Sequence, residues 1–200
     1  MTSGIYLIWD LPLADGVEPE DFFAALGDDL PCAVQLRAKG CVGEPVVLDA
    51  LTQACERRQI PLFINDQRAW LRASHAGIHL GQDDGPSCGF DGFAVSRSTH
   101  DLDQVRLALL DPTISSLGFG PVRSTHNKVG ALPARGLASL AAAVVAAQPK
   151  PVIAIGGIRQ ADLGAIRRCG AHSAAVIGAV WQAPHPAHAL RQLVCAWAAA

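Results

Sequence analysis

Two short apolar runs in the sequence end in side chains that bind cations. In "LFINDQ" (62–67), Asn65 and Asp66 directly follow three apolar residues, and in "IHLGQDDG" (78–85), an acidic pair that ends in Asp84 follows a second apolar run. Carboxylate oxygens are ligands that Mg2+ prefers in proteins. Asp66 and Asp84 are therefore candidate Mg2+ ligands, and the alternatives are an N-cap for Asp66 and a surface turn for Asp84.

Cationic side chains lie near the ends of other apolar runs. In "VQLRAKG", Gln35, Arg37 and Lys39 alternate, so an extended backbone would direct all three to one face, and Lys128 follows a later run. Such a set suits phosphate oxygens, although ordinary solvated loop residues would give the same pattern. Because carboxylates nearby would repel a phosphate unless Mg2+ lay between them, the combination favours a metal-assisted phosphate site.

Two later apolar runs end in glycine before a predicted helix. "AIGGI" (154–158) contains Gly157, and "AVIGAV" (175–180) contains Ile177 and Gly178. Glycine at such a place exposes backbone N–H groups at a helix N-terminus and lets an anion approach. A purely steric role at a strand-to-helix turn is the alternative. The sequence therefore indicates a second anion site, built from backbone groups.

These residues need a scaffold that brings distant segments together. Eight β-rich runs alternate with helical stretches rich in Ala and Leu. The predicted strands cover residues 4–9, 32–36, 61–64, 77–80, 92–96, 115–120, 151–155 and 173–178, and the predicted helices cover 43–58, 66–74, 101–110, 134–147, 160–169 and 187–198. Short strands buried on both faces favour a single-domain (β/α)8 TIM barrel over residues 1–200, with the active site at the C-terminal ends of the strands.

An open, Rossmann-type sheet is the alternative fold. Against it, no G-x-G-x-x-G follows the first strand, and "IGGIRQ" at 155–160 comes at the seventh strand and lacks the third glycine. The segment 81–91 is too short and too rich in Gly and Pro for a full helix. We therefore expect the fourth helix to be stunted or replaced by a loop.

The composition indicates a protein that acts on small molecules. Half of the 200 residues are apolar, and the net charge is -2, with Lys and Arg scattered, so no nucleic acid and no membrane surface is expected as a partner. The six cysteines form no C-x-x-C pair, which indicates reduced thiols. The N-terminal segment has no basic region and its apolar run is broken by Asp10, so a cytoplasmic location is the default expectation.

Three histidines lie in the predicted strands or at their ends. His79 falls inside a strand, where an interior residue of the barrel is a simpler interpretation than a catalyst. His100 and His126 fall on the predicted rim, and either could titrate near neutral pH. The sequence shows no His and Cys spacing typical of a metal site.

Several segments resemble, in order and spacing, the motifs of the thiamine phosphate synthase family. They are "YLIWD", "VQLRAK", "FINDQRAWLRASHAGIHLGQDD", "SRSTHDLDQ", "GFGPVRSTHNK" and "PVIAIGGI" followed by "AAVIGAV". The resemblance extends over nearly the whole chain. It implies a Mg2+-dependent transferase of thiamine biosynthesis on a TIM barrel, and it leaves a homo-oligomer open. Such an enzyme joins 4-amino-2-methyl-5-(diphosphooxymethyl)pyrimidine to 4-methyl-5-(2-phosphooxyethyl)thiazole and releases diphosphate.

The resemblance also implies roles for individual residues. Asp66 and Asp84 would bind Mg2+, and departure of diphosphate would leave a cation that the thiazole nitrogen captures. The implied catalytic residues are Arg37, Lys39, Ser98 and Lys128. The implied substrate-binding residues are Gln35, Arg37, Lys39, Asn65, Ser98 and Lys128 for the pyrimidine diphosphate, and Thr125, Asn127, Gly157, Ile177 and Gly178 for the thiazole phosphate.

The sequence departs from the family pattern at the thiazole side. Asn127 stands where a second threonine is usual, and Gly178 stands where a serine is usual. "SRSTH" is also similar to the related thiazole tautomerases, which carry a histidine after the sixth strand, where this chain has Pro121. Two alternatives stay open: a tautomerase that uses His100 or His126, and a noncatalytic homologue that binds thiamine precursors.

Overall fold

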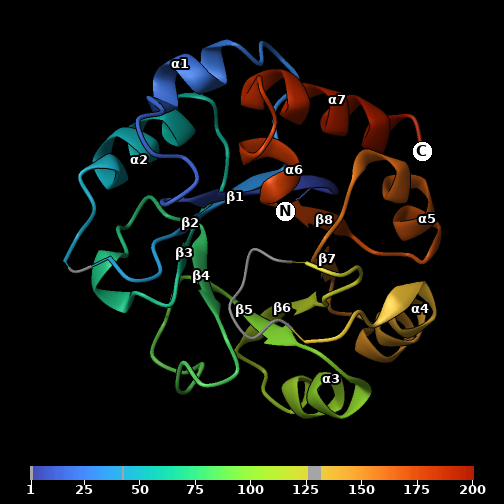
Figure 1. Ribbon diagram of the computed structural model, residues 1–200. Helices are drawn as coiled ribbons and strands as arrows, with labels where there is room; N and C mark the ends of the chain where they lie inside the picture. Colours follow the sequence, from blue (N-terminus) through green and yellow to red (C-terminus); the bar gives the residue numbers. More distant parts are fainter. Residues whose placement is uncertain (1, 42, 126–131) are drawn as a thin grey trace.

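Eight parallel strands form a closed barrel in the structure, a computed structural model that describes residues 2–41, 43–125 and 132–200. The strands pair in chain order and β8 returns to β1, as Figure 1 shows in a view into the barrel. They are β1 (Gly4–Asp10), β2 (Ala33–Arg37), β3 (Leu62–Asn65), β4 (Gly77–Leu80), β5 (Ala94–Thr99), β6 (Ile114–Phe119), β7 (Val152–Ile155) and β8 (Ser173–Val176). The predicted (β/α)8 TIM barrel is confirmed.

Helices surround most of the barrel, whereas loops cover the region between α2 and α3 (Figure 1). They are α1 (Pro19–Ala24), α2 (Val47–Arg57), α3 (Leu102–Leu109), α4 (Gly136–Ala147), α5 (Leu163–Arg168), α6 (Gly178–Trp181) and α7 (Pro186–Ala198), with the 3-10 turns η1 (Arg68–Trp70) and η2 (Gln160–Asp162). The short helices α1 and α6 were not predicted from the sequence. Among the described residues, no helix is both long enough and apolar enough to cross a membrane.

Both faces of the strands are buried, which explains their nearly continuous apolar runs. On β1, Leu7 and Trp9 point outward into the core beneath the helices, whereas Tyr6 and Ile8 belong to a separate cluster inside the barrel. Trp9 packs against Trp181 of α6, with ring centroids 4.9 Å apart. Alternate side chains of β1 thus pack into the outer core and into the barrel interior.

The third connection contradicts the predicted helix over 66–74. Only the short turn η1 forms there. Asp66 has a φ of 62°, in the left-handed region, so the backbone cannot enter an α-helix at this residue. The N-cap position of η1 is occupied by Gln67, so Asp66 is not the N-cap that the sequence offered as an alternative.

The fourth connection has no helix at all, as the Gly-rich and Pro-rich segment 81–91 predicts. The strand that follows begins later than the predicted 92–96 and occupies Ala94–Thr99. Gly92 has a φ of 83°, which keeps the chain in a turn up to that point. Arg97 consequently lies on β5 itself, not in the connection after it.

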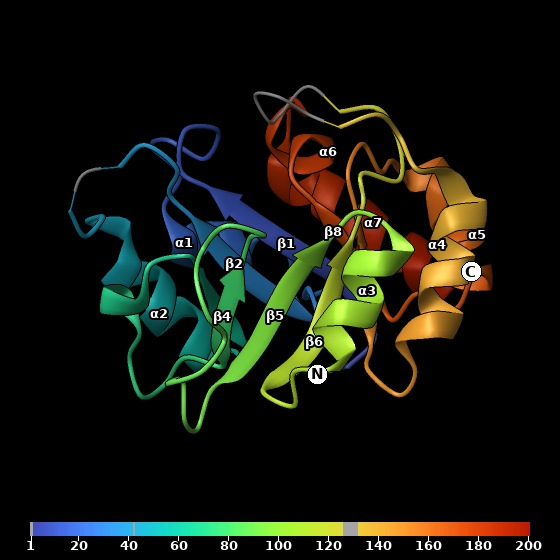
Figure 2. The ribbon, with the colours of Figure 1, turned by 90° about the horizontal axis from the view of Figure 1, so that it is seen from below.

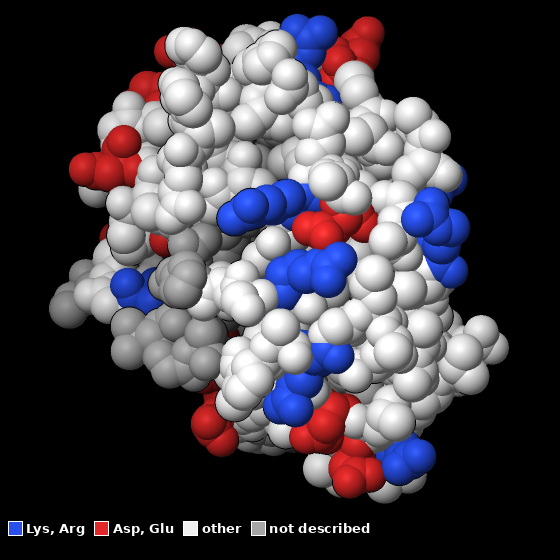
Figure 3. Space-filling view, turned by 45° about the vertical axis from the view of Figure 1, so that its right-hand side comes forward, with Lys and Arg blue, Asp and Glu red and all other residues white. Residues whose placement is uncertain are grey.

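Charged side chains on the surface are mixed in sign. On the face shown in Figure 3, Lys and Arg lie beside Asp and Glu and form no continuous basic field. Glu20 of α1, for example, forms salt bridges with Arg57 and Arg58 of α2. Exposed pairs of this kind contribute at most about 1 kcal/mol each, so apolar packing is what holds the helices on the barrel.

His75 is a buried neutral group in the segment before β4. It is 5% exposed and lies beside a cavity of about 270 Å³ between α2 and the starts of β3 and β4. The amide N–H of Arg72 donates to Nδ1 at 3.1 Å, so Nδ1 is unprotonated, and Nε2 lies 3.0 Å from the Thr52 hydroxyl oxygen. Burial, together with the charge of Arg72, lowers the pKa of His75 to about 4.

We predict that His75 makes folding stability depend on pH. Unfolding restores a histidine pKa of about 6.5, so the unfolded chain binds more protons between about pH 6.5 and pH 4. The stabilisation from neutral His75 is complete above this window and is lost as the pH falls through it, by up to about 3 kcal/mol. Urea unfolding at several pH values should show that the stability advantage of the wild type over His75→Asn shrinks across the window.

His188, an exposed histidine on α7, provides the matched control. His188→Asn should keep the pH dependence of the wild type. An advantage over His75→Asn that stays constant between pH 6.5 and pH 4 would show that His75 does not titrate differently in the two states.

Candidate active site

The C-terminal ends of the strands carry most of the polar residues that the sequence analysis selected. Figure 2 shows the strand arrows directed toward one end of the barrel, its mouth. Arg37 ends β2, Asn65 ends β3, and Ser98 lies one residue before the end of β5. Closure of the barrel therefore brings together side chains that are far apart in the sequence.

Asp66 is the centre of the polar contacts at the mouth. Its carboxylate forms a salt bridge with Lys39 and accepts a hydrogen bond from the side-chain amide of Asn65. The side chain of Asp66 is 13% exposed, whereas that of Lys39 is 53% exposed. Lys39 thus reaches from the solvent toward a carboxylate that is mostly enclosed.

Asp84, from the connection after β4, lies within hydrogen-bonding reach of Asp66. Burial, and then the contact with Asp84, raises the pKa of Asp66 to about 6 against the opposing effect of Lys39. The same contact lowers the pKa of Asp84. Two carboxyl groups in contact cannot both ionise at low cost, so a cation bound between them would favour the doubly ionised pair.

This pair fits Mg2+. The ion takes oxygen ligands, and it is commonly held by one or two carboxylates together with water and substrate phosphates. Among the described residues, no group of three His, Cys, Asp or Glu side chains could hold a metal ion. Asp66 and Asp84 would therefore hold Mg2+ only with oxygens from water and substrate.

Asp10 holds Arg37 and was not selected by the sequence analysis. It ends β1, its side chain is 5% exposed, and it forms a salt bridge with the guanidinium of Arg37. A buried carboxylate needs such a partner, and the pairing in turn fixes the guanidinium at the mouth. The relevant pattern is visible in "YLIWD", where a charged residue ends an apolar strand.

A cavity inside the barrel has a polar wall formed by Tyr6, Gln35 and His79. The hydroxyl of Tyr6 donates to Gln35 Oε1 at 3.2 Å, and His79 Nε2 lies 2.9 Å from the hydroxyl oxygen of Ser98. A Cβ at Gly118 would lie 3.2 Å from the imidazole, so glycine leaves room for it. His79 is an interior residue, as predicted, but its contact with Ser98 also makes it part of the candidate site.

The connections after β6 and β7 lie against each other. The amide N–H of Arg123 donates to the carbonyl oxygen of Gly156 at 2.9 Å. Gly157 has a φ of 63°, and a Cβ there would lie only 2.3 Å from the carbonyl oxygen of Ser124. The close packing therefore explains why glycine stands at 157.

Among the described residues, the others expected at the thiazole phosphate lie on the same side of the barrel, because β6, β7 and β8 are neighbours. Thr125 lies in the connection after β6, while Ile177 and Gly178 follow β8, with Gly178 as the first residue of α6. His126, Asn127 and Lys128 lie outside the described residues.

His100, which the sequence analysis placed on the rim, joins two connections. Its Nδ1 lies 2.6 Å from the carbonyl oxygen of Gly120, the residue that follows β6. The backbone N–H of His100 is itself bound by the side chain of Gln104 on α3, at 2.7 Å. These bonds give His100 a structural role between the β5 and β6 connections.

Comparisons with known proteins agree with this arrangement. A family model described as thiamine monophosphate synthase matches residues 21–180. The chain is 35% identical to the thiamine-phosphate synthase of Acidothermus cellulolyticus over 98% of this chain and 95% of that protein. It is 37% identical to that of Anaeromyxobacter dehalogenans over 84% and 78% of the two chains.

A solved structure supports the same grouping. The thiamine phosphate pyrophosphorylase of Pyrococcus furiosus superposes with a TM-score of 0.81 and 25% sequence identity, over 98% of this chain and 96% of that one. Because the family model covers most of the chain and the Acidothermus relative aligns over nearly all of both proteins, the chain belongs to the thiamine monophosphate synthase family.

Proposed function

We propose that the protein is a thiamine phosphate synthase that joins the pyrimidine diphosphate to the thiazole phosphate and releases diphosphate. The observation that carries the proposal is the contact between Asp66 and Asp84 at the barrel mouth, next to Lys39. A carboxylate pair beside cations is the arrangement that a metal-bound diphosphate requires. We also propose that residues 1–200 form one domain, since all eight strands close a single barrel.

The leaving diphosphate is the group that the mouth is built to receive. Arg37, held in place by Asp10, and Lys39, beside Asp66, direct positive charge to the space where diphosphate would gain negative charge. Preorganised charge of this kind stabilises a transition state without reorganisation during the reaction. When bound, Mg2+ adds positive charge at the diphosphate oxygens, and Asp66 and Asp84 are the residues that would hold it.

The pyrimidine ring would lie above the polar residues that line the barrel interior, because the cavity itself, at about 20 Å³, has room for no more than a water molecule. Gln35 is buried and already bound to Tyr6, while His79 and Ser98 form a second bonded pair. Such fixed partners orient donors and acceptors toward a heterocycle without loss of side-chain entropy on binding. In this proposal the hydroxyl of Ser98, held by His79, would contact the pyrimidine diphosphate.

The thiazole phosphate would bind where the connections after β6, β7 and β8 meet. Backbone N–H groups near Gly157 and Gly178, with the hydroxyl of Thr125, supply the donors. Holding the thiazole nitrogen beside the reacting carbon then supplies much of the catalysis, because capture of the cation needs no protein nucleophile. Asn127 and Lys128 belong to this proposal on the family resemblance alone.

The first test is an assay of the purified protein with both precursors, with and without Mg2+. We expect thiamine phosphate to form with Mg2+ and to be undetectable by chromatography in excess EDTA. Full turnover in EDTA would contradict the metal-assisted mechanism. Isomerisation of a thiazole carboxylate phosphate without condensation would indicate a tautomerase, and binding of the pyrimidine diphosphate without any product would indicate a noncatalytic homologue.

The second test removes one carboxylate. Asp66→Asn keeps the shape of the side chain and its contact with Asn65 but removes a charged metal ligand, so kcat/KM should fall by at least about 100-fold. Asp91→Asn is the matched control, because Asp91 is an exposed aspartate in the turn before β5, at the opposite end of the strands. Steady-state kinetics at saturating Mg2+ should be measured for both variants, and Asp91→Asn should keep the wild-type kcat/KM. Equal kcat/KM values for the two variants would show that Asp66 has no role in the mechanism.

A further inference from the structure

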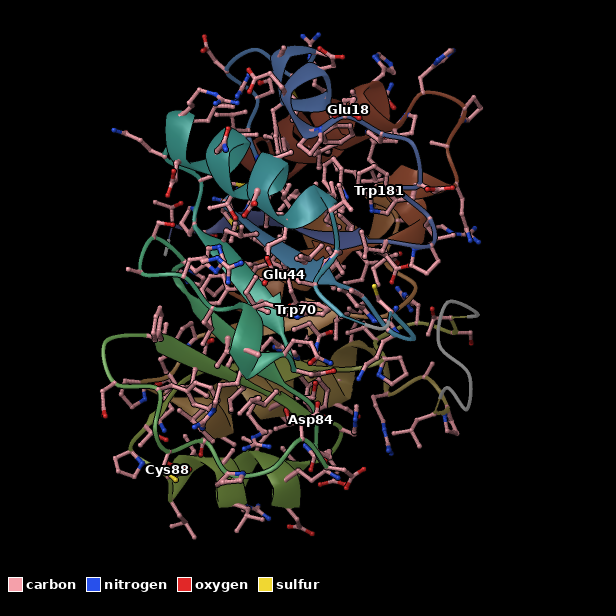
Figure 4. All side chains as sticks on the ribbon, turned by 90° about the vertical axis from the view of Figure 1, so that its left-hand side faces the viewer. Glu18, Glu44, Trp70, Asp84, Cys88 and Trp181 are labelled. Atoms are coloured by element: carbon pink, nitrogen blue, oxygen red, sulfur yellow. The ribbon has the colours of Figure 1, made fainter. Side chains whose placement is uncertain are left out.

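The connection between β4 and β5 carries Asp84 but contains no helix. Figure 4 shows Asp84 near the mouth end of this connection and Cys88 farther down the outside of the barrel. In a regular β/α unit, helix packing would fix the start of the connection. Here other interactions must hold Asp84 in place, because the metal pair with Asp66 requires a defined position.

Arg97 supplies these interactions from the outer face of β5. Its Nη1 donates to the carbonyl oxygen of Gly81 at 2.8 Å, and its Nη2 donates to the carbonyl oxygen of Gly85 at 2.8 Å. The two carbonyl groups lie on either side of Asp84 in the chain. One guanidinium thus joins the beginning of the Asp84 turn to its end.

The turn is also closed from within. The amide N–H of Gly81 donates to Asp84 Oδ2 at 2.6 Å, and Gly85 has a φ of 82°. The carboxylate of Asp84 therefore accepts a hydrogen bond from the backbone of its own turn, at Gly81, and also contacts Asp66. Any change in the separation of Gly81 and Gly85 would rotate this carboxylate away from its partner.

A second guanidinium holds the far part of the connection. Arg68 of η1 donates to the carbonyl oxygen of Cys88 at 2.9 Å and lies 4.1 Å from the ring centroid of Phe90. These contacts of Arg68 are with residues beyond the turn from Gly81 to Gly85, so Arg68 anchors the later part of the connection. Within the turn, the side-chain amide of Gln82 also donates to the carbonyl oxygen of Ser98 on β5, but only Arg97 bonds to both ends of the turn.

Arg97 has no competing ionic partner. In the part of the chain that the structure describes, it forms no salt bridge, and its bonds all go to the Asp84 turn. A planar guanidinium can reach two carbonyl oxygens at once, whereas a lysine ammonium can replace at most one of these bonds with good geometry. The chemistry of arginine is therefore matched to this task.

We propose, on the basis of the proposed function, that Arg97 is a positioning residue that fixes Asp84 opposite Asp66 for Mg2+ binding. It acts through the backbone of the turn and touches neither substrate nor metal. Groups that orient metal ligands in this way typically change metal affinity by about 10-fold to 100-fold when they are removed. Arg97 should thus control metal affinity more than the chemical step.

The first experiment measures hydrogen exchange in the metal-free protein. Arg97→Met removes both bonds and keeps the aliphatic stem, and the amides of residues 81–85 should exchange at least about 10-fold faster than in the wild type. Arg97→Lys should give an intermediate rate. Arg106→Met, which removes an exposed arginine of α3, should leave these amides unchanged. Unchanged exchange in Arg97→Met and Arg97→Lys would overturn the proposal.

The second experiment titrates the metal. The Mg2+ concentration for half-maximal activity and the Mn2+ affinity measured by electron paramagnetic resonance should both weaken about 10-fold in Arg97→Met, while the KM for the thiazole phosphate stays unchanged. A general loss of folding would instead lower the melting temperature and change both KM values, and Arg97→Lys then decides the outcome. Equal Mn2+ affinities in the wild type and both variants would overturn the proposal.

The two proposals fail in different ways. A wild type that binds no Mn2+ and needs no Mg2+ would end the metal-assisted function, whereas a Mg2+-dependent wild type with unaffected Arg97 variants would end only the role of Arg97. Hydrogen exchange in residues 81–85 needs no metal and no substrate. It therefore tests whether Arg97 fixes the Asp84 turn even if the protein uses no Mg2+.

Discussion

The contact between Asp66 and Asp84 is the constraint on which the mouth of the barrel depends. Two carboxylates in a partly buried place repel each other, and Lys39 and the side-chain amide of Asn65, which both contact Asp66, offset part of this repulsion. Asp66 adopts a φ of 62°, a conformation that costs a non-glycine residue on the order of 1 kcal/mol. The fold tolerates both costs at one residue, which is typical of a functional site.

The scaffold around this contact is uneven. The third and fourth connections lack α-helices, and both carry one aspartate of the pair. A helix starting directly after Asn65 would need Asp66 in the right-handed region and would turn its carboxylate elsewhere. Irregular backbone therefore lets the two side chains meet, and the side chains of Arg68 and Arg97 replace the missing helix packing.

The sequence allowed the barrel to be predicted because buried parallel strands leave a strong local pattern. It also drew attention to Asp66 and Asp84, which the structure brings into contact, because polar residues directly follow such strands, while their role as metal ligands stays a prediction. It did not reveal Asp10 or Tyr6, whose partners are 27 and 29 residues away in the chain. The predicted helix over 66–74 was wrong: Asp66 has a left-handed φ, and the chain leaves the 3-10 turn at Leu71 in an extended conformation. Long-range pairing and backbone strain are the properties that local pattern cannot supply.

Gly157 shows why steric and functional interpretations of one residue are not exclusive. The close approach of Ser124 requires glycine there, since a Cβ would lie 2.3 Å from its carbonyl oxygen. That same approach brings the connection after β6 against the turn after β7, where a phosphate could be surrounded by backbone donors from both. If a larger residue stood at 157, the two segments would separate and the donors would diverge. Packing of the glycine is thus the means by which the proposed anion site would be formed.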